Sequence, residues 1–443
     1  MFRSMLAASL GLVVVVAAGF VASARSEASS ARAAIAAPAP ELTQLTAIVE
    51  AGLVRVNSET LRPLGKRIPV GSGGCAPRQG GTACWSVPPW TVSPDAAQLA
   101  VARNDASSLR LVDIRRMRVT ADVRLDGGAV GALAWLASGR VLALQEVASE
   151  RQRLVAIDLT GRRVVARRAL GGSVVRLGRT ARELVMLLAP AQAIGPARIA
   201  VADRQGAVRF VRLERIVAGS KLLETGSDHR VDARLPGLAV DPQGRRAFVV
   251  DKSLVAEIDL RTLAVSYHTL ERPASLLGRL WNWLEPAAEA KQVSGHVRSA
   301  RWLGGDLLAV SGTDIEQTGA RPVGLLVFNT RSWSVRTIDD EATGFVVAEN
   351  LLLATGMSWD AATSKTTGMG IAAYGFDGEE RFQLFDGESA WVAQVYGGRA
   401  YVGISGQDER LRIVDLSAGS VIGERLLPLP RLVRGVASGW WEG

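Results

Sequence analysis

A short phrase that recurs about every 40 residues constrains this chain more than any other feature. It consists of two or three apolar residues, then Asp or Asn, then a polar turn, then an alternating strand. The clearest copies are Leu111-Val112-Asp113-Ile114, Ala156-Ile157-Asp158-Leu159, Glu257-Ile258-Asp259-Leu260, Val327-Phe328-Asn329-Thr330 and Ile413-Val414-Asp415-Leu416. Repetition at this period indicates stacked or radially arranged units, and four short strands per unit predict a β-propeller.

Period-2 alternation of apolar and polar residues shows where the strands of each unit are expected. The complete repeats are placed at about 85–126, 129–170, 173–215, 237–270, 297–338, 344–385 and 390–427. Leu45 to Val70 supplies three strands of a further unit, and Leu432 to Ala437 could supply its fourth. We therefore predict an all-β fold, a single propeller of four-stranded blades over 41–438, whose ring is closed by N- and C-terminal strands. Eight blades are favoured, with seven as the alternative.

The composition fits this architecture. A chain of 443 residues with 48% hydrophobic content can fill one closed propeller with a large core. The net charge of +9 comes from arginines that are spread along the chain rather than clustered with aromatic residues. We therefore expect a solvated Arg-rich surface and no nucleic-acid partner.

The first 24 residues have the pattern of a secretory signal peptide. Arg3 is followed by the apolar run Leu6 to Val21 and by the small residues Ala22-Ser23-Ala24. We expect a secreted or extracytoplasmic protein (periplasm or cell surface), monomeric, with no transmembrane span after cleavage; an uncleaved N-terminal anchor is the alternative. Residues 25–40 resemble a disordered linker rich in Ala, Ser and Pro, and 439–443 form a tail.

The two cysteines, Cys75 and Cys84, lie in a Gly-rich stretch. In an oxidising compartment, two close cysteines in a flexible loop are expected to form a disulfide. On the chain-entropy model it would stabilise the fold by roughly 2–3 kcal/mol. A metal site is the alternative, but no His or third Cys lies nearby in sequence to complete a tetrahedral set.

Two turns of the chain resemble those of a known family of repeats. Ser93-Pro94-Asp95 and Asp241-Pro242-Gln243-Gly244 resemble the turn of bacterial WD40-like and YVTN-type propellers. The resemblance implies a propeller that is often secreted or periplasmic. It implies no activity, because propellers host many functions.

The topology of a propeller predicts where function should lie. In a four-stranded meander the second-to-third connections and the connections between blades lie on one face of the ring. The longest segments all fall on that face: the Cys75–Cys84 loop, Ile216 to Leu235, Glu271 to His296, Gly312 to Pro322 and Gly356 to Gly368. Elaborated loops on a rigid scaffold are the usual place for function, so we expect this face to bind the ligand or partner.

One of these segments, 271–296, is predicted to contain a helical insertion. Leu276, Leu280 and Trp281 fall at helical spacing, and Pro286 would end the helix. The simplest interpretation is a short helix packed on the propeller. A partner groove or a membrane-surface contact through Trp281 and Trp283 is the alternative.

Few side chains are candidates for a metal-binding, ligand-binding or catalytic site. Of three histidines, His268 is expected on the surface of an outer strand, whereas His229 and His296 could approach each other and, with a carboxylate, bind a divalent metal. Trp359 and Asp314 are further candidate ligand-binding residues in the long segments. No nucleophile elbow, phosphate loop or dinucleotide motif is present.

These observations favour an exported, non-catalytic scaffold that binds a protein partner or a cell-envelope ligand through its loop-rich face. No catalytic residue, metal ligand or cofactor is assigned. The alternative is a metal-dependent hydrolase of the propeller-lactonase type.

Overall fold

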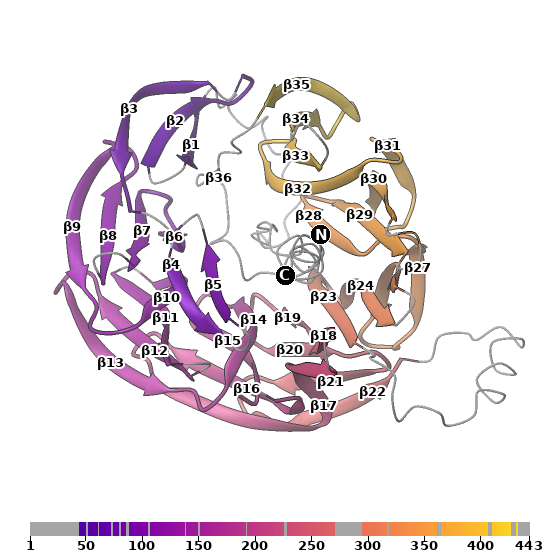
Figure 1. Ribbon diagram of the computed structural model, residues 1–443, viewed down its shortest axis with the longest axis horizontal. Helices are drawn as coiled ribbons and strands as arrows, with labels where there is room; N and C mark the ends of the chain where they lie inside the picture. The colour runs from indigo at the N-terminus through magenta and orange to yellow at the C-terminus, as the bar shows by residue number, and fades with distance from the viewer. Residues whose placement is uncertain are drawn as a thin grey trace, which may run out of the picture.

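The strands of the protein form a ring around a central axis (Figure 1). The computed structural model describes residues 44–49, 52–60, 62–71, 74–78, 81–85, 88–104, 107–137, 139–148, 151–191, 193–225, 228–270, 295–316, 319–360, 363, 365–405, 410–426 and 431–432. Within these ranges the regular elements are β-strands. The predicted all-β propeller with four-stranded blades is therefore confirmed.

Five four-stranded sheets in the ring are separate from one another. In order of hydrogen-bonded neighbours they are β3 (Pro63–Pro69), β2 (Gly52–Asn57), β1 (Gln44–Val49) and β36 (Arg431–Leu432); β6 (Trp90–Val92), β7 (Gln98–Arg103), β8 (Ser108–Asp113) and β9 (Arg118–Arg124); β10 (Ala129–Ala137), β11 (Arg140–Ala148), β12 (Arg151–Asp158) and β13 (Arg163–Ala169); β19 (Gly237–Val240), β20 (Arg246–Val250), β21 (Leu254–Asp259) and β22 (Val265–Thr269); and β32 (Ser389–Tyr396), β33 (Arg399–Ser405), β34 (Arg410–Asp415) and β35 (Ser420–Leu426).

The remaining strands of the ring belong to one sheet of 14 strands. They are β14 (Ser173–Arg179), β15 (Glu183–Ala189), β16 (Gly195–Asp203), β17 (Val208–Thr225), β18 (Asp228–Leu235), β23 (Gly295–Gly304), β24 (Leu307–Glu316), β25 (Gly319–Pro322), β26 (Leu325–Asn329), β27 (Val335–Asp339), β28 (Gly344–Ala348), β29 (Leu351–Asp360), β30 (Lys365–Gly375) and β31 (Glu380–Leu384). A separate two-stranded hairpin, β4 (Gly74–Arg78) and β5 (Gly81–Trp85), precedes β6.

The prediction of eight separate blades is wrong, as is the alternative of seven, because the described strands of the ring form six sheets. The physical reason is that several strands continue beyond their own meander. The extended ends of β17 and β24 pair with β18 and β25. In turn β18 pairs with β23, and β25 pairs with the extended end of β29, so that neighbouring meanders merge into one sheet.

The two ends of the chain meet in one sheet. β1 pairs with β36 through Ala47 opposite Leu432 and Ile48 opposite Arg431. The predicted strand Leu432 to Ala437 lies outside the described residues beyond its first position. The last sheet also packs against the first, since Tyr401 is buried in the same apolar cluster as Ile48.

The recurring phrase forms the turn between the third and fourth strands. The side-chain oxygens of Asp113, Asp158, Asp259, Asn329 and Asp415 each accept hydrogen bonds from backbone N–H groups two or three residues further on. These residues therefore hold the turn, as short polar side chains commonly do.

Candidate functional site

The long segments on the predicted face are largely extended strands rather than irregular loops. Three of them extend hairpins away from the ring: β17–β18, β24–β25 and β29–β30. Gly219 marks the point where β17 leaves its blade. Its φ of +127° is a conformation that suits glycine, and a Cβ there would lie 2.1 Å from the carbonyl oxygen of Ala193.

Hydrogen bonds join these extensions laterally. β18 pairs in parallel with β23 at Arg234 and His296, and β25 pairs with β29 at Ala320 and Trp359. β23 and β24 pair along their whole length and connect the two junctions. The result is one continuous sheet that joins the hairpins β17–β18, β24–β25 and β29–β30, and we call the surface of these hairpins the hairpin face.

The predicted binding residues are distributed unevenly over this face. Trp281 and Trp283 lie outside the described residues, as does the predicted helix up to residue 294. The backbones of His229 and Trp359 lie in β18 and β29, but their side chains are outside the described part. The structure thus places only His296 and Asp314 with their contacts.

His296 lies in β23 rather than in a connection between blades. It is 8% exposed, and its Nε2 lies 2.6 Å from Asp251 Oδ1. The contact is an ion pair when the imidazole is protonated; Nε2 has no well-directed hydrogen bond among the described residues. Burial alone would raise the pKa of Asp251, but the contacts with His296 and the Lys252 N–H hold this pKa below its ordinary 3.8.

Asp314 lies opposite His296 in the neighbouring strand β24 and binds a different cation. Its Oδ1 accepts a hydrogen bond of 2.5 Å from Nη2 of Arg298. Arg298 is only 2% exposed, and its Nη1 donates to the carbonyl oxygens of Val297 and Thr313 at 3.1 and 3.0 Å. A buried charge needs an ion-pair partner and hydrogen bonds of this kind, because an unpaired buried charge strongly destabilises the fold.

Arg176 completes the cluster from the neighbouring inner strand β14. It donates from Nη1 to the carbonyl oxygen of Val175 and from Nη2 to that of Arg298, at 2.9 and 3.1 Å. The side chain keeps partial contact with solvent, yet protein surrounds its guanidinium and lowers its pKa to about 10. No carboxylate pairs with Arg176 among the described residues.

This cluster ties four elements of the ring together. Asp251 comes from the β20–β21 turn, Arg176 from β14, and the other members from β23 and β24. Each carboxylate is engaged by a basic side chain, which suits anchoring better than proton transfer. Arg176, Arg298 and Asp251 were not among the residues predicted from the sequence. Arginines inside otherwise apolar inner strands were the available signal.

The cysteines lie on the hairpin β4–β5. The backbone register places Cys75 directly opposite Cys84. Their side chains are outside the described part of the chain, so the disulfide stays a prediction. Figure 1 shows this hairpin on the inner side of the ring, near β10 and β14.

A metal centre finds no support in the described ranges. No three His, Cys, Asp or Glu side chains gather there in a way that could hold an ion. The hypothetical pairing of His229 with His296 is untested, because the side chain of His229 is outside those ranges. Among the same residues, no helix has the length and apolar character needed to cross a membrane.

Comparisons with known proteins agree with the architecture. No family model matches the chain, and no curated protein matches it. A solved structure of dihydro-heme d1 dehydrogenase NirN in complex with DHE is similar, with a TM-score of 0.54 and 13% identity over 94% of this chain and 80% of that one. The chain is a β-propeller repeat protein.

Two further solved structures are more distant. BamB from Moraxella catarrhalis has a TM-score of 0.43 and 13% identity, over 81% of this chain and 92% of that one. A europium-containing methanol dehydrogenase has a TM-score of 0.45 and 8% identity, over 81% and 79%. At such identities a likeness shows the fold alone, so these names assign no activity to the propeller.

Proposed function

We propose that this propeller is an exported scaffold that binds a protein partner or a cell-envelope ligand through its hairpin face. The observation that carries the proposal is the lateral hydrogen bonding of three hairpins into one continuous surface. Blades can close a ring without such extensions, so the added strands indicate a role beyond folding. Joined hairpins also present a pre-organised surface, which lowers the entropy lost on binding.

The ion-pair cluster supports the same function. Arg298 and His296 hold β23, and β23 connects the β17–β18 hairpin to the β24–β25 hairpin. A binding surface of this kind needs a rigid base, since mobility would weaken each contact. Export through the N-terminal segment is part of the proposal and is tested by determining the N-terminus of the mature protein.

The experiment compares photo-crosslinking at two positions on the same strand, one in the hairpin face and one outside it. A photo-crosslinking residue is placed at Lys221, which is exposed on the extended part of β17, and separately at Phe210, which is 43% exposed on the part of β17 within its blade. The proposal expects a discrete crosslinked partner from cell envelopes at position 221 and none at position 210. Equal crosslinking at both positions, or at neither, would contradict it.

A charge-swap pair then tests the surface independently of crosslinking. Glu316 and Arg321 form an exposed ion pair 3.3 Å apart at the β24–β25 hairpin. Arg212 and Glu214 form an exposed ion pair 3.2 Å apart on β17, in the part of this strand within its blade. Swapping the first pair should weaken binding of the crosslinked partner, whereas swapping the second should leave it unchanged. Both swaps keep an ion pair, so the fold is preserved.

A further inference from the structure

The face opposite the hairpins contains a cavity of about 610 Å³ between the sheets β6–β9 and β10–β13. This volume is within the roughly 300–1,000 Å³ typical of small-molecule sites. From the first sheet it is lined by the turn that contains Asp95 and by side chains of β8 and β9, including Leu111. From the second sheet it is lined by Trp135 of the inner strand β10 and by the turn residues Leu159 and Arg162. Nothing in the hairpin-face proposal uses these residues.

The same chain contains an equivalent groove between β19–β22 and β23–β27, and backbone hydrogen bonds establish the correspondence. Ser93 N donates to Gln98 O at 2.9 Å, as Asp241 N does to Arg246 O at 2.9 Å. In the second sheet of each pair, Leu159 N donates to Gly139 O at 2.9 Å, as Thr330 N does to Asp306 O at 2.7 Å.

The equivalent groove is filled by aromatic rings. Phe248 is fully buried and stacks on Trp302 with ring centroids 5.3 Å apart, and Trp333 packs against Phe248 at 6.4 Å. His268, expected to be a simple surface residue, stacks on Trp333 at 3.8 Å. Arg246 lies over Phe248 and Trp302, 5.4 and 5.2 Å from their centroids.

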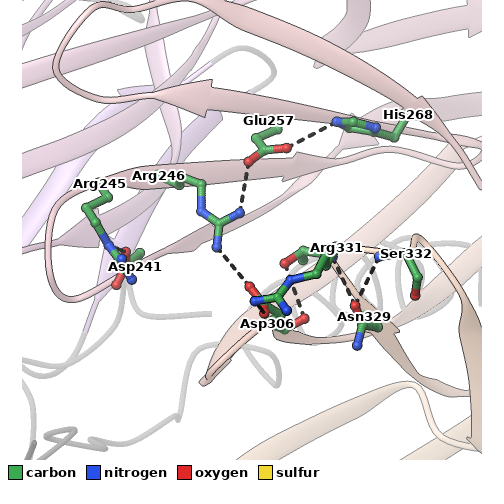
Figure 2. Close-up of polar contacts among 10 residues, drawn as sticks. Asp241, Arg245, Arg246, Glu257, His268, Asp306, Asn329, Arg331 and Ser332 are labelled. Atoms are coloured by element: carbon green, nitrogen blue, oxygen red, sulfur yellow. Dashed lines mark hydrogen bonds and ion pairs between the residues drawn. The ribbon is translucent and has the colours of Figure 1, made fainter.

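An ion-pair network closes the filled groove (Figure 2). Arg246 binds Glu257 at 3.1 Å and reaches Asp306 at 3.4 Å, and Arg331 binds the other oxygen of Asp306 at 2.8 Å. Glu257 also contacts His268 at 3.1 Å. Every group in this groove has an internal partner.

In the first groove the corresponding positions carry different side chains, and this difference opens the cavity. The register and turn hydrogen bonds show which residues correspond. Two aromatic positions change: Ala100 corresponds to Phe248, and Arg162 to Trp333. Four charged positions also change: Gln98 corresponds to Arg246, Leu111 to Glu257, Gly139 to Asp306 and Thr160 to Arg331. The tryptophan is retained as Trp135. Ala100 is itself fully buried and does not line the cavity, so the open space lies where Trp333 and the bridging charges are found in the equivalent groove.

The lining has both an apolar floor and two opposite charges. Leu111, Leu159 and Trp135 are buried, at 5%, 7% and 3% exposure. Arg162 is exposed in its turn and has no hydrogen bond or ion pair among the described residues. Asp95 is also exposed and interacts with the charge of Arg115; its Oδ1 accepts hydrogen bonds from Ser93 Oγ at 2.6 Å and Ala97 N at 3.2 Å, whereas no other described residue donates to its Oδ2.

From this arrangement we infer that the groove between β6–β9 and β10–β13 binds a small zwitterion with an aromatic side chain, of the free α-amino-acid class. The aromatic ring takes the space that Trp333 fills in the equivalent groove, against the apolar floor of Leu111, Leu159 and Trp135. Arg162 binds the carboxylate, for which a guanidinium supplies well-directed donors. Asp95 binds the ammonium group through its free oxygen.

The test is calorimetric binding of L-phenylalanine to the mature protein, with two analogues that each lack one charge. Phenylacetate lacks the ammonium group and phenethylamine lacks the carboxylate. Both should bind about two- to fivefold more weakly than L-phenylalanine, because each loses one ion pair with an exposed residue of the groove. Undetectable binding of L-phenylalanine, or equal binding of the three compounds, would overturn the inference.

Variants assign the binding to this groove. Arg162→Gln should weaken binding of L-phenylalanine to a similar degree, whereas Arg163→Gln, an exposed neighbour that does not line the cavity, should leave it unchanged. Arg162→Trp should abolish binding while folding normally, because Trp333 occupies the same turn position with nearly the same φ, 57° against 51°. Retained affinity in Arg162→Trp would place the ligand elsewhere and refute the assignment.

Discussion

Replacing Phe248 with Ala would give the filled groove the residue that the open one has at the corresponding position, Ala100. Phe248 is fully buried, and its ring is parallel to that of Trp302 within 4°. Truncation of a buried Phe costs about 3–5 kcal/mol through lost transfer energy and the cavity left behind. The stacked pair accounts for about 0.5–1.5 kcal/mol of the interaction. We expect Phe248→Ala to lower the free energy of unfolding by about 4 kcal/mol.

Urea unfolding followed by tryptophan fluorescence measures this loss, with the slope of the transition checked for a change in mechanism. Phe210→Ala is the matched control: its ring is 43% exposed and its only aromatic contact in the described residues is with Arg198, 5.7 Å from the ring centroid. That control should cost less than about 1 kcal/mol. If both variants lost the same small amount, the stacking between the two sheets would not contribute to stability and the account of the filled groove would fail.

Three further predictions concern the inner ion pairs and the cysteines. Asp314→Leu should destabilise the fold by about 3–5 kcal/mol because the buried Arg298 loses its carboxylate partner, and the double variant Arg298→Met/Asp314→Leu should recover much of the loss in a double-mutant cycle. Additive losses would show that the two side chains do not interact. Asp251 has a depressed pKa in the folded protein, so its contribution to stability is complete above the ordinary value of 3.8 and disappears as the pH falls through the lower folded value. The stability difference between wild type and Asp251→Asn should therefore persist from pH 7 to pH 5 and vanish in stronger acid, and a difference independent of pH would contradict the assignment. Cys75 and Cys84 face each other in the register of β4–β5, so the oxidised protein should gain two thiols and lose roughly 2–3 kcal/mol of stability on reduction; free thiols in protein purified from an oxidising compartment would refute the disulfide.

The strands and turns of the ring were predictable because their causes are local. An Asp or Asn at the third-to-fourth turn bonds to backbone N–H groups two or three residues away, so its position in sequence marks the turn wherever it occurs. Alternation of apolar and polar residues similarly locates a strand before its neighbours are known. The face on which the long segments lie followed from the order of the strands alone.

The number of separate sheets was not predictable, because it depends on pairing between segments far apart in sequence. β25 pairs with β29, about 40 residues further along the chain, and nothing local to Ala320 or Trp359 indicates this pairing. His296 was expected in a connection between blades for the same reason. Its inclusion in β23 depends on pairing with β24 and β18.

The two grooves show most clearly which features follow from the sequence and which from the tertiary structure. By itself the sequence determined the repeat and the propeller fold, because these depend on periodicity and short-range hydrogen bonds. Only the tertiary structure decided that one groove is filled and the other open. That outcome depends on whether Arg162 or Trp333 lies in the turn of the second sheet, and on whether charges such as Arg246 and Asp306 come within reach across the interface. Packing between sheets is a property of side-chain volume and position in space, and no local pattern encodes it.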